Sequence, residues 1–163
     1  MMEPRSSRPY MPGYGISPPG EGTGLLPWSW AVERLSRSHD YWVATVRPDG
    51  RPHVMPVEGV WMRDMLWFSS SGRSRKTRNL AGNPRAVMTT DNALEPVVVE
   101  GDAERVTDAD EVAAFVGAVN AKYGTDYPVD FFMRNACFRL RPVWAFALAE
   151  SDFAGSPTRW MFD

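Results

Sequence analysis

Hydrophobic and polar residues alternate along several short stretches of the chain, a pattern typical of β-strands with one buried face. Turn-forming residues separate these stretches, as in Pro48-Asp-Gly50 and Arg63-Asp64. The pattern predicts strands over residues 41–46, 53–62, 65–69, 85–90, 97–106 and 137–149. The first three are joined by short turns and therefore predict an antiparallel meander. The run Val97-Val98-Val99 is β-branched and uninterrupted, which predicts a strand segment buried on both faces.

A period of three to four residues predicts helices in other parts of the chain. Trp28, Ala31 and Leu35 fall on one face of the first helix. Thr107 is the expected N-cap of a longer helix, and Gly124 is expected to end it. The helices are predicted over residues 27–38, 74–81, 107–124 and 131–134.

These elements predict a mainly β protein with peripheral helices. Strands follow one another through hairpins instead of alternating with helices, which favours a small antiparallel barrel of six or seven strands over a Rossmann sheet. Residues 1–24 are rich in Pro, Gly and Ser and are expected to form an irregular N-terminal arm. The arm either lies on a surface, such as that of another subunit, or is a free tail. Residues 25–163 are expected to form one domain.

Composition narrows the class of protein. The 163 residues include 44% hydrophobic residues and carry a formal net charge of −2, which argues against a general nucleic-acid-binding protein. A single cysteine, Cys137, is compatible with a reducing cytoplasm. We expect no signal peptide and no membrane span, because no apolar run is long enough. Seven tryptophans and eight phenylalanines suit a compact β core or a pocket for a flat ring.

The most informative stretch is Phe68-Ser-Ser-Ser-Gly-Arg-Ser-Arg-Lys-Thr-Arg-Asn-Leu80. It predicts a strand end, a loop of small residues, and a helix with Ser74 as its N-cap. Cations crowd the first turn of this helix, where the helix dipole favours carboxylates. An external anion such as a phosphate would resolve this conflict. The alternative is a solvated basic helix, and the local pattern does not separate the two.

Other kinds of chemistry lack their residues. The chain has two histidines, His39 and His53, and no spacing of metal ligands. It has no nucleophile elbow, no Walker loop and no dinucleotide fingerprint, and Cys137 falls within an apolar strand. We identify no catalytic acid, base or nucleophile. A phosphate site in an aromatic-rich barrel instead suits a protein whose bound cofactor carries the chemistry.

Four motifs then identify a resemblance. Arg51-Pro-His-Val-Met-Pro-Val57, Leu66-Trp-Phe-Ser-Ser-Ser71, Ser74-Arg-Lys-Thr-Arg-Asn-Leu80 and Asn83-Pro-Arg85 occur in this order. In order and spacing they resemble the pyridoxamine 5′-phosphate oxidase-like split β-barrel superfamily, and within it the flavin/deazaflavin oxidoreductase branch B. The resemblance covers about residues 28–149. It implies a split β-barrel and a homodimer with two cofactor sites at the subunit interface, each built from both chains.

The resemblance also implies site residues. The cofactor's phosphate and ribityl chain would meet the stretch that begins with the three serines, and the strand Met55-Pro-Val-Glu-Gly59 would run beneath the ring. The second subunit would close the site. The implied cofactor-binding residues are Met55, Pro56, Val57, Glu58, Ser69, Ser70, Ser71, Arg73, Ser74, Arg75, Lys76, Arg78, Asn79, Asp91, Asn92 and Trp144.

Glu58 departs from the family pattern, which often has an aromatic or small residue at that position. Its carboxylate would lie near an electron-rich reduced ring, so either it faces away or the ring chemistry is altered. His53 has two readings, near the ring or facing solvent, and we expect the second.

The branch contains users of FMN and users of coenzyme F420, a deazaflavin with an anionic tail. Arg73, Arg75, Lys76 and Arg78 supply more cations than one phosphate needs, with Arg5 and Arg8 of the arm as possible additions, which favours F420 over FMN. For Arg85 we expect a solvated surface residue. The expected function is hydride transfer between reduced F420 and a small conjugated substrate. The alternatives are an FMN-dependent oxidase of the pyridoxamine-phosphate type, a non-catalytic cofactor-binding protein and, least favoured, a nucleic-acid-binding module.

Overall fold

The computed structural model describes residues 3–18, 21 and 24–163. The strands are β1 (Arg5–Ser7), β2 (Asp40–Val46), β3 (Pro52–Met62), β4 (Met65–Ser70), β5 (Arg85–Thr90), β6 (Val97–Val106), β7 (Ala136–Ala147) and β8 (Thr158–Met161). The helices are α1 (Trp28–Arg37), α2 (Arg75–Gly82), α3 (Ala109–Tyr123) and α4 (Val129–Met133), with one 3-10 turn at Glu150–Asp152.

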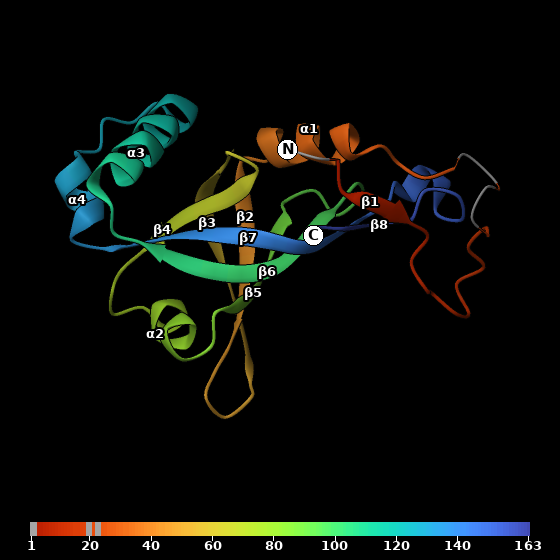
Figure 1. Ribbon diagram of the computed structural model, residues 1–163, viewed down its shortest axis with the longest axis horizontal. Coiled ribbons are helices and arrows are strands. Elements are labelled where there is room, and N and C mark those ends of the chain that lie inside the picture. Colours follow the sequence, from red (N-terminus) through yellow and green to blue (C-terminus); the bar gives the residue numbers. More distant parts are fainter. Residues whose placement is uncertain (1–2, 19–20, 22–23) are drawn as a thin grey trace.

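The strands form an antiparallel barrel (Figure 1). Their order is β1-β8-β7-β4-β3-β2-β5-β6, and β6 also pairs with β7. This last pairing closes β2 to β7 into a six-stranded barrel, while β8 and β1 extend the sheet beyond β7. The predicted fold class, a mainly β barrel with peripheral helices, is therefore confirmed.

The barrel is filled by the inward-facing residues of its strands. Tyr41, Leu66, Phe68 and Met88 are fully buried. Near the middle of β6 a side chain is sterically excluded, because a Cβ on Gly101 would lie 1.8 Å from the carbonyl oxygen of Arg141. The register between β6 and β7 shifts at this point, between Glu100 and Gly101 and opposite Pro142, as in a β-bulge.

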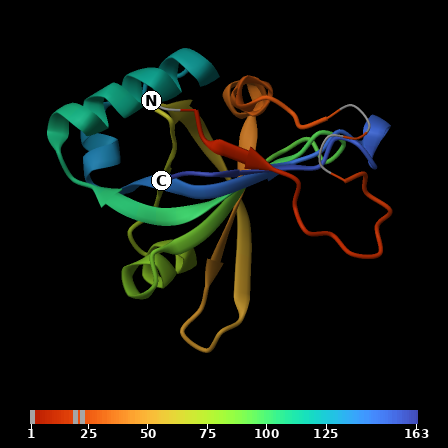
Figure 2. The same ribbon diagram turned by 45° about the vertical axis from the view of Figure 1, so that its right-hand side comes forward.

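A second apolar layer lies outside the barrel. Trp67 of β4 and Cys137 of β7 are buried there against Phe115 and Val116 of α3 and Phe132 of α4. In Figures 1 and 2 this helix pair lies on one side of the barrel, and α2 lies on the opposite side beside the β2–β3 hairpin. The two sides of the barrel therefore offer different surfaces, one aromatic and one basic.

The structure corrects three predictions. Val98 is partly exposed between the buried Val97 and Val99, because a barrel strand turns alternate residues outward. The N-cap of α3 is Asp108 and not Thr107: its carboxylate accepts hydrogen bonds from the amides of Asp110 and Glu111 at 3.1 and 2.9 Å. The predicted irregular arm contains a strand, because Arg5–Ser7 pairs with β8. Residues 1–2, 19–20 and 22–23 of that arm lie outside the described residues.

Candidate cofactor site

The first turn of α2 is held by a chain of polar side chains. Ser74 is the N-cap, as predicted, and its hydroxyl accepts a hydrogen bond from the amide of Thr77 at 3.2 Å. The Ser70 hydroxyl lies 2.9 Å from that of Ser74 and accepts a hydrogen bond from the ammonium of Lys76 at 3.0 Å. The hydroxyl of Ser71 accepts a hydrogen bond from the amide of Arg73 at 3.2 Å. Hydrogen bonds of its own serines therefore hold the loop in shape, and all the residues involved are close together in the sequence.

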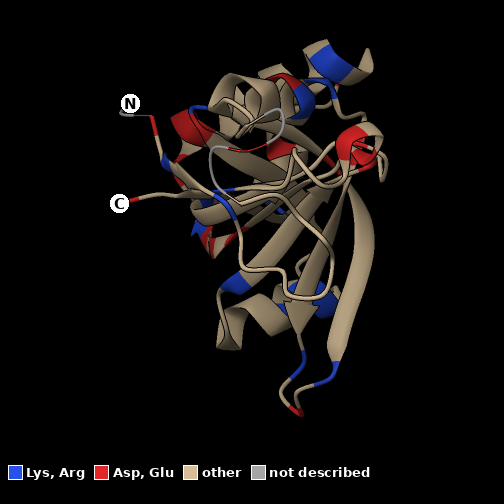
Figure 3. Ribbon diagram, turned by 90° about the vertical axis from the view of Figure 1, so that its right-hand side faces the viewer, with Lys and Arg blue, Asp and Glu red and all other residues tan. Residues whose placement is uncertain are grey.

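The cations of this loop and helix lack carboxylate partners. Among the described residues, no ion pair joins Arg73, Arg75, Lys76 or Arg78 to an acidic side chain. Burial lowers the pKa of the Lys76 ammonium, so its charge costs free energy in this structure as it stands. Figure 3 shows Lys and Arg gathered around α2 and the β2–β3 hairpin, with acidic colour at the hairpin tip. This surplus of unanswered positive charge fits the phosphate of a flavin-type cofactor.

Strand β3 borders this basic site with a free edge. Its pairing with β4 covers Gly59–Met62, whereas its pairing with β2 extends from Pro52 to Glu58. Among the described residues, the segment that holds Met55, Pro56, Val57 and Glu58 therefore pairs on one side alone. Met55 is 46% exposed and Val57 is buried. A free strand edge offers backbone donors and acceptors that can orient a flat ring.

Two buried polar atoms lie under α2. Asn79 is 2% exposed, and its amide donates to the hydroxyl of Thr45 at 3.0 Å. Its carbonyl oxygen and the Nδ1 atom of His53 are buried without a partner among the described residues. Burial, together with the positive charges of Arg47, Lys76 and Arg75, lowers the pKa of His53. The His53 side chain is half-buried, and the expectation that it faces solvent does not hold at Nδ1.

Three of the implied residues lie elsewhere in the chain: Asp91 and Asn92 directly follow β5, and Trp144 is on β7. The Asp91 carboxylate accepts a hydrogen bond from the Ser38 hydroxyl at 3.1 Å. The side-chain oxygen of Asn92 accepts one from the Leu94 amide at 3.0 Å. Trp144 lies on β7 opposite Glu100 of β6. In one chain these residues do not join the serine loop. That they close the site of a second subunit remains a prediction.

The N-terminal arginines are engaged within the chain. Arg5 forms an ion pair with Asp163 at 3.0 Å. Arg8 donates to the carbonyl oxygens of Gly155 and Pro157 at 2.6 and 2.8 Å. Within one chain both arginines lie away from the basic site, because β1 docks on β8, away from α2 (Figure 1). That they add to a cofactor site built from two chains remains a prediction.

A clamp on Gly59 was not predicted from the sequence. The Lys122 ammonium donates to the Gly59 carbonyl oxygen at 2.6 Å, and the Gly59 amide donates to the Tyr123 hydroxyl at 2.9 Å. A Cβ on Gly59 would lie 2.8 Å from the Trp67 carbonyl oxygen. Burial lowers the pKa of Lys122 to about 8 and raises that of Tyr123 to about 12. These contacts fix the peptide that follows Glu58. No sequence pattern indicates these contacts, because Tyr123 fits equally well into the apolar stripe of α3.

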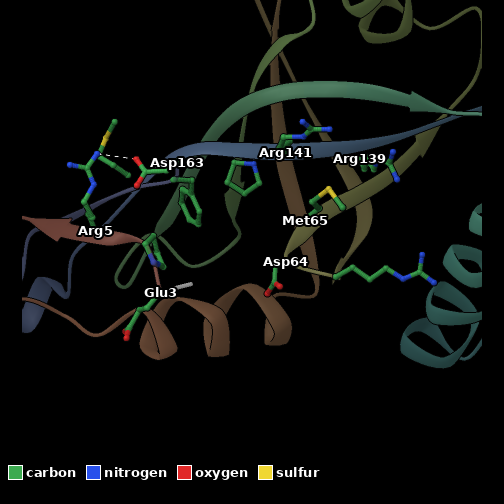
Figure 4. Close-up of a pocket in the computed structure, with 12 residues that line it drawn as sticks. Glu3, Arg5, Asp64, Met65, Arg139, Arg141 and Asp163 are labelled. Carbon is green, nitrogen blue, oxygen red and sulfur yellow. Dashed lines mark hydrogen bonds and ion pairs between the residues drawn. The ribbon is translucent and has the colours of Figure 1, made fainter. Parts of the chain in front are cut away.

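A larger cavity, about 830 Å³, lies elsewhere, between β1, the β3–β4 turn, β7 and the C-terminal residues (Figure 4). Three of its arginines form ion pairs with carboxylates, among them Arg141 with Glu104 at 3.5 Å. Arg5 pairs with Asp163, and Arg139 contacts Glu104 and Glu111 at 3.0 and 2.9 Å. Arg63 has no ion pair among the described residues, but it is the one such arginine in this lining, whereas four cations without a carboxylate partner gather at the serine loop and α2.

Other classes of site find no support in the part of the chain that the structure describes. No group of three or more His, Cys, Asp or Glu residues there could hold a metal ion. Nor does any described helix have the length and apolar character to cross a membrane.

Comparison with known proteins decides the family. A family model described as pyridoxamine 5′-phosphate oxidase matches residues 31–151. The chain belongs to this family. Proteins of the pyridoxamine 5′-phosphate oxidase family bind flavin or deazaflavin cofactors, which agrees with the basic site at α2 and the free edge of β3.

The similar proteins include both an oxidase and an F420 reductase. A pyridoxine/pyridoxamine 5′-phosphate oxidase of Paracidovorax citrulli (strain AAC00-1) is 43% identical over 77 residues, which are 45% of this chain and 34% of the relative. The match thus spans about a third of that oxidase's length. A solved F420 reductase is 30% identical, with a TM-score of 0.58 over 69% of this chain and 93% of that chain. The conserved hypothetical protein Rv2991 of Mycobacterium tuberculosis has the same fold, with a TM-score of 0.68 at 19% identity over 83% and 85% of the two chains.

Proposed function

We propose that the protein is an oxidoreductase that binds a reduced deazaflavin, coenzyme F420, and passes hydride from it to a small conjugated substrate. The observation that carries this proposal is the cation cluster of α2, which has no carboxylate partner among the described residues, beside the free edge of β3. The bound cofactor supplies the hydride. The chain binds its phosphate, orients its ring along β3 and excludes water.

The protein's own residues divide this work. Lys76, Ser70 and the first-turn amides of α2 hold the phosphate, because a helix start leaves its N–H groups without intrahelical partners. Arg73 and Arg78 extend the positive surface towards an anionic tail. The clamp of Lys122 and Tyr123 on Gly59 keeps the strand under the ring in place.

The choice of F420 over FMN rests on charge and on one relative. Four cations exceed what a single phosphate needs, and the solved F420 reductase is 30% identical over most of its own chain. The identity to pyridoxine/pyridoxamine 5′-phosphate oxidases favours the alternative, an FMN-dependent oxidase of that type. A second alternative is a protein that binds the cofactor without turnover, for which Glu58 beside the ring is the reason.

The proposed site needs a second copy of the chain, and the outside of the barrel offers a surface for it. Outward residues of five strands form two cross-strand rows. One row runs Pro56, Trp42, Thr89, Val98 and Phe146, and the other runs Val54, Ala44, Val87, Glu100 and Trp144. Trp42 is 47% exposed and Val54 is 50% exposed. An apolar face of this extent suits a homodimer, and it would carry Trp144 to the partner's site.

Titration of the purified protein with F420 and with FMN, followed by cofactor fluorescence, tests the proposal. We expect F420 to bind more tightly than FMN. Tighter binding of FMN would promote the oxidase alternative, and binding of neither would reject a cofactor role.

Sedimentation tests the dimer. We expect a mass of twice 18.3 kDa at micromolar concentration, and we expect Trp42→Asp to halve it and weaken F420 binding. Leu94→Asp places the same charge at another exposed apolar residue and should change neither property. A monomer with full affinity would remove the two-chain site.

A further inference from the structure

A cavity of about 320 Å³ lies between Glu58, within β3, and the end of β4, beside α3 and α4. It is next to the proposed cofactor site, since the serine loop forms one of its walls. A cavity of this size holds one small ring system. Its lining residues are Glu58, Ser69, Ser70, Ser71, Phe115, Val119, Tyr127, Phe131, Phe132 and Asn135.

The helix side of the cavity is aromatic. Tyr127 and Phe131 stack with ring centroids 5.8 Å apart and an angle of 16° between their planes. Phe132 meets Phe131 and Phe115 edge to face, at 5.7 and 5.6 Å. Phe131 is nevertheless 46% exposed, which is unusual for a ring that belongs to a packed cluster. Ring faces carry a partial negative charge, so such a wall accepts flat rings and cations.

The strand side carries a single charged group. Glu58 is the one charged residue among those that line the cavity. It is exposed, and within the described residues its carboxylate has neither a hydrogen bond nor an ion pair. The clamp on Gly59 holds the adjacent peptide, so the backbone that carries Glu58 is fixed.

Lys122 lies outside the cavity but interacts with Glu58. Lys122 is near enough for the two charges to attract each other. Its ammonium, however, is directed at the Gly59 carbonyl oxygen at 2.6 Å and lies 3.3 Å from the Tyr41 hydroxyl, over the rings of Tyr41 and Tyr123. Glu58 therefore keeps its hydrogen-bonding capacity for a ligand.

We propose that this cavity binds a planar aromatic molecule bearing a positively charged nitrogen group, and that Glu58 selects its charge. The ring stacks on Tyr127 and Phe131, and the nitrogen donates to the Glu58 carboxylate. The cavity thus prefers the charge opposite to the one preferred at α2. The assignment of this molecule as the substrate rests on the proposed function, whereas its binding does not.

Three probes of nearly the same shape test the charge preference. Benzamidine is cationic, benzamide is neutral and benzoate is anionic. Each is titrated into cofactor-free protein labelled with ¹⁵N, and amide shifts report both affinity and location. We expect benzamidine to bind at least about fivefold more tightly than benzamide, with benzoate weakest, and the shifts to include Ser69–Ser71 and the side-chain amide of Asn135.

Matched variants identify the groups responsible. Glu58→Gln should remove the preference for benzamidine over benzamide, whereas Glu150→Gln makes the same charge change beyond the far end of β7 and should leave the preference intact. Phe131→Leu should weaken all three probes about threefold or more, and Phe153→Leu should not. Phe131 and Phe153 are both partly exposed, at 46% and 39%, so neither change should prevent folding.

The contrary outcomes are distinct. Equal affinities, no binding of any probe, tighter binding of benzoate, shifts confined to another surface, or a preference that survives in Glu58→Gln would each overturn the inference. Failure to bind F420 or FMN would overturn the proposed function and leave the probe result standing. Adding F420 then tests the substrate role: benzamidine should still bind, and its displacement would show that the cofactor ring itself fills the cavity.

Discussion

Two groups of cations on the outside of the barrel, at β7 and at α2, differ in whether they have carboxylate partners. Arg139 of β7 contacts the carboxylates of Glu104 at 3.0 Å and Glu111 at 2.9 Å. Lys76 of α2 has the hydroxyl of Ser70 at 3.0 Å. Hydrogen bonding to Glu104 and Glu111 raises the pKa of Arg139, whereas burial lowers that of Lys76. A cation that pairs with a carboxylate of its own chain supports the fold, whereas a cation without such a partner is available to bind an anionic ligand.

The difference follows from what each group costs the folded protein. Buried or half-buried charges without partners are unfavourable, and natural sequences usually place a carboxylate beside them. At β7 the chain does so twice. At α2 it places serines instead, and these can share their hydroxyls with a phosphate.

The largest effect should come from removing the cations of α2. Arg75→Ala with Lys76→Ala should weaken cofactor binding by at least about 2 kcal/mol, because charge-assisted hydrogen bonds contribute roughly 1.5–3 kcal/mol each. Stability of the cofactor-free protein should stay the same or rise, since two cations leave the positive end of a helix dipole. Fluorescence titration measures the first effect and urea denaturation the second. Unchanged affinity would mean that the cluster is a solvated basic face.

The converse change at β7 should affect stability and not binding. Glu111→Ala removes one carboxylate from Arg139, whose side chain is 19% exposed, and should lower the free energy of unfolding by about 1–2 kcal/mol. Cofactor affinity should not move. The exposed Glu150→Ala is the control for urea denaturation. If Glu111→Ala weakened cofactor binding as much as the α2 variant does, the proposed difference between the two groups of cations would be wrong.

A smaller effect should separate the inner cations of α2 from the outer ones. Arg73→Ala with Arg78→Ala should reduce the preference for F420 over its tail-less analogue about threefold, because exposed charges are screened within about 8–10 Å at ordinary salt. Raising the salt should have the same selective effect on the wild-type protein. Titrations at low and high salt measure both. Equal salt sensitivity of the two ligands would show that the tail does not reach these arginines.

The smallest effect concerns Lys122, which belongs to neither group of cations. Its ammonium donates to a carbonyl oxygen and lies over two aromatic rings. Burial lowers its pKa from 10.5 to about 8. Between pH 8 and 10 the unfolded chain therefore binds more protons at this residue than the folded protein does, so its contribution to stability should rise with pH. The slope of unfolding free energy against pH should be shallower in Lys122→Met. Parallel slopes for the two proteins would place the titration elsewhere.

Local sequence accounts for much of the fold and for the loop of the candidate site. Alternation placed the six barrel strands within one or two residues of their observed ends, and Ser74 caps α2 as its neighbours predict. Both depend on residues close together in the chain. The motif from Ser69 to Asn79 is likewise continuous, so the sequence was sufficient to nominate it.

Contacts between distant segments were decided by the tertiary structure. The pairing of β1 with β8 joins residues more than 150 positions apart, and neither three-residue stretch has a pattern strong enough to find the other. The same holds for Lys122 and Tyr123 at Gly59 and for the aromatic wall of the cavity opposite Glu58. Periodicity tells which face of an element is buried but not which element buries it. Closure of the barrel by β6 and β7 made that choice here, because it fixed where each helix could pack.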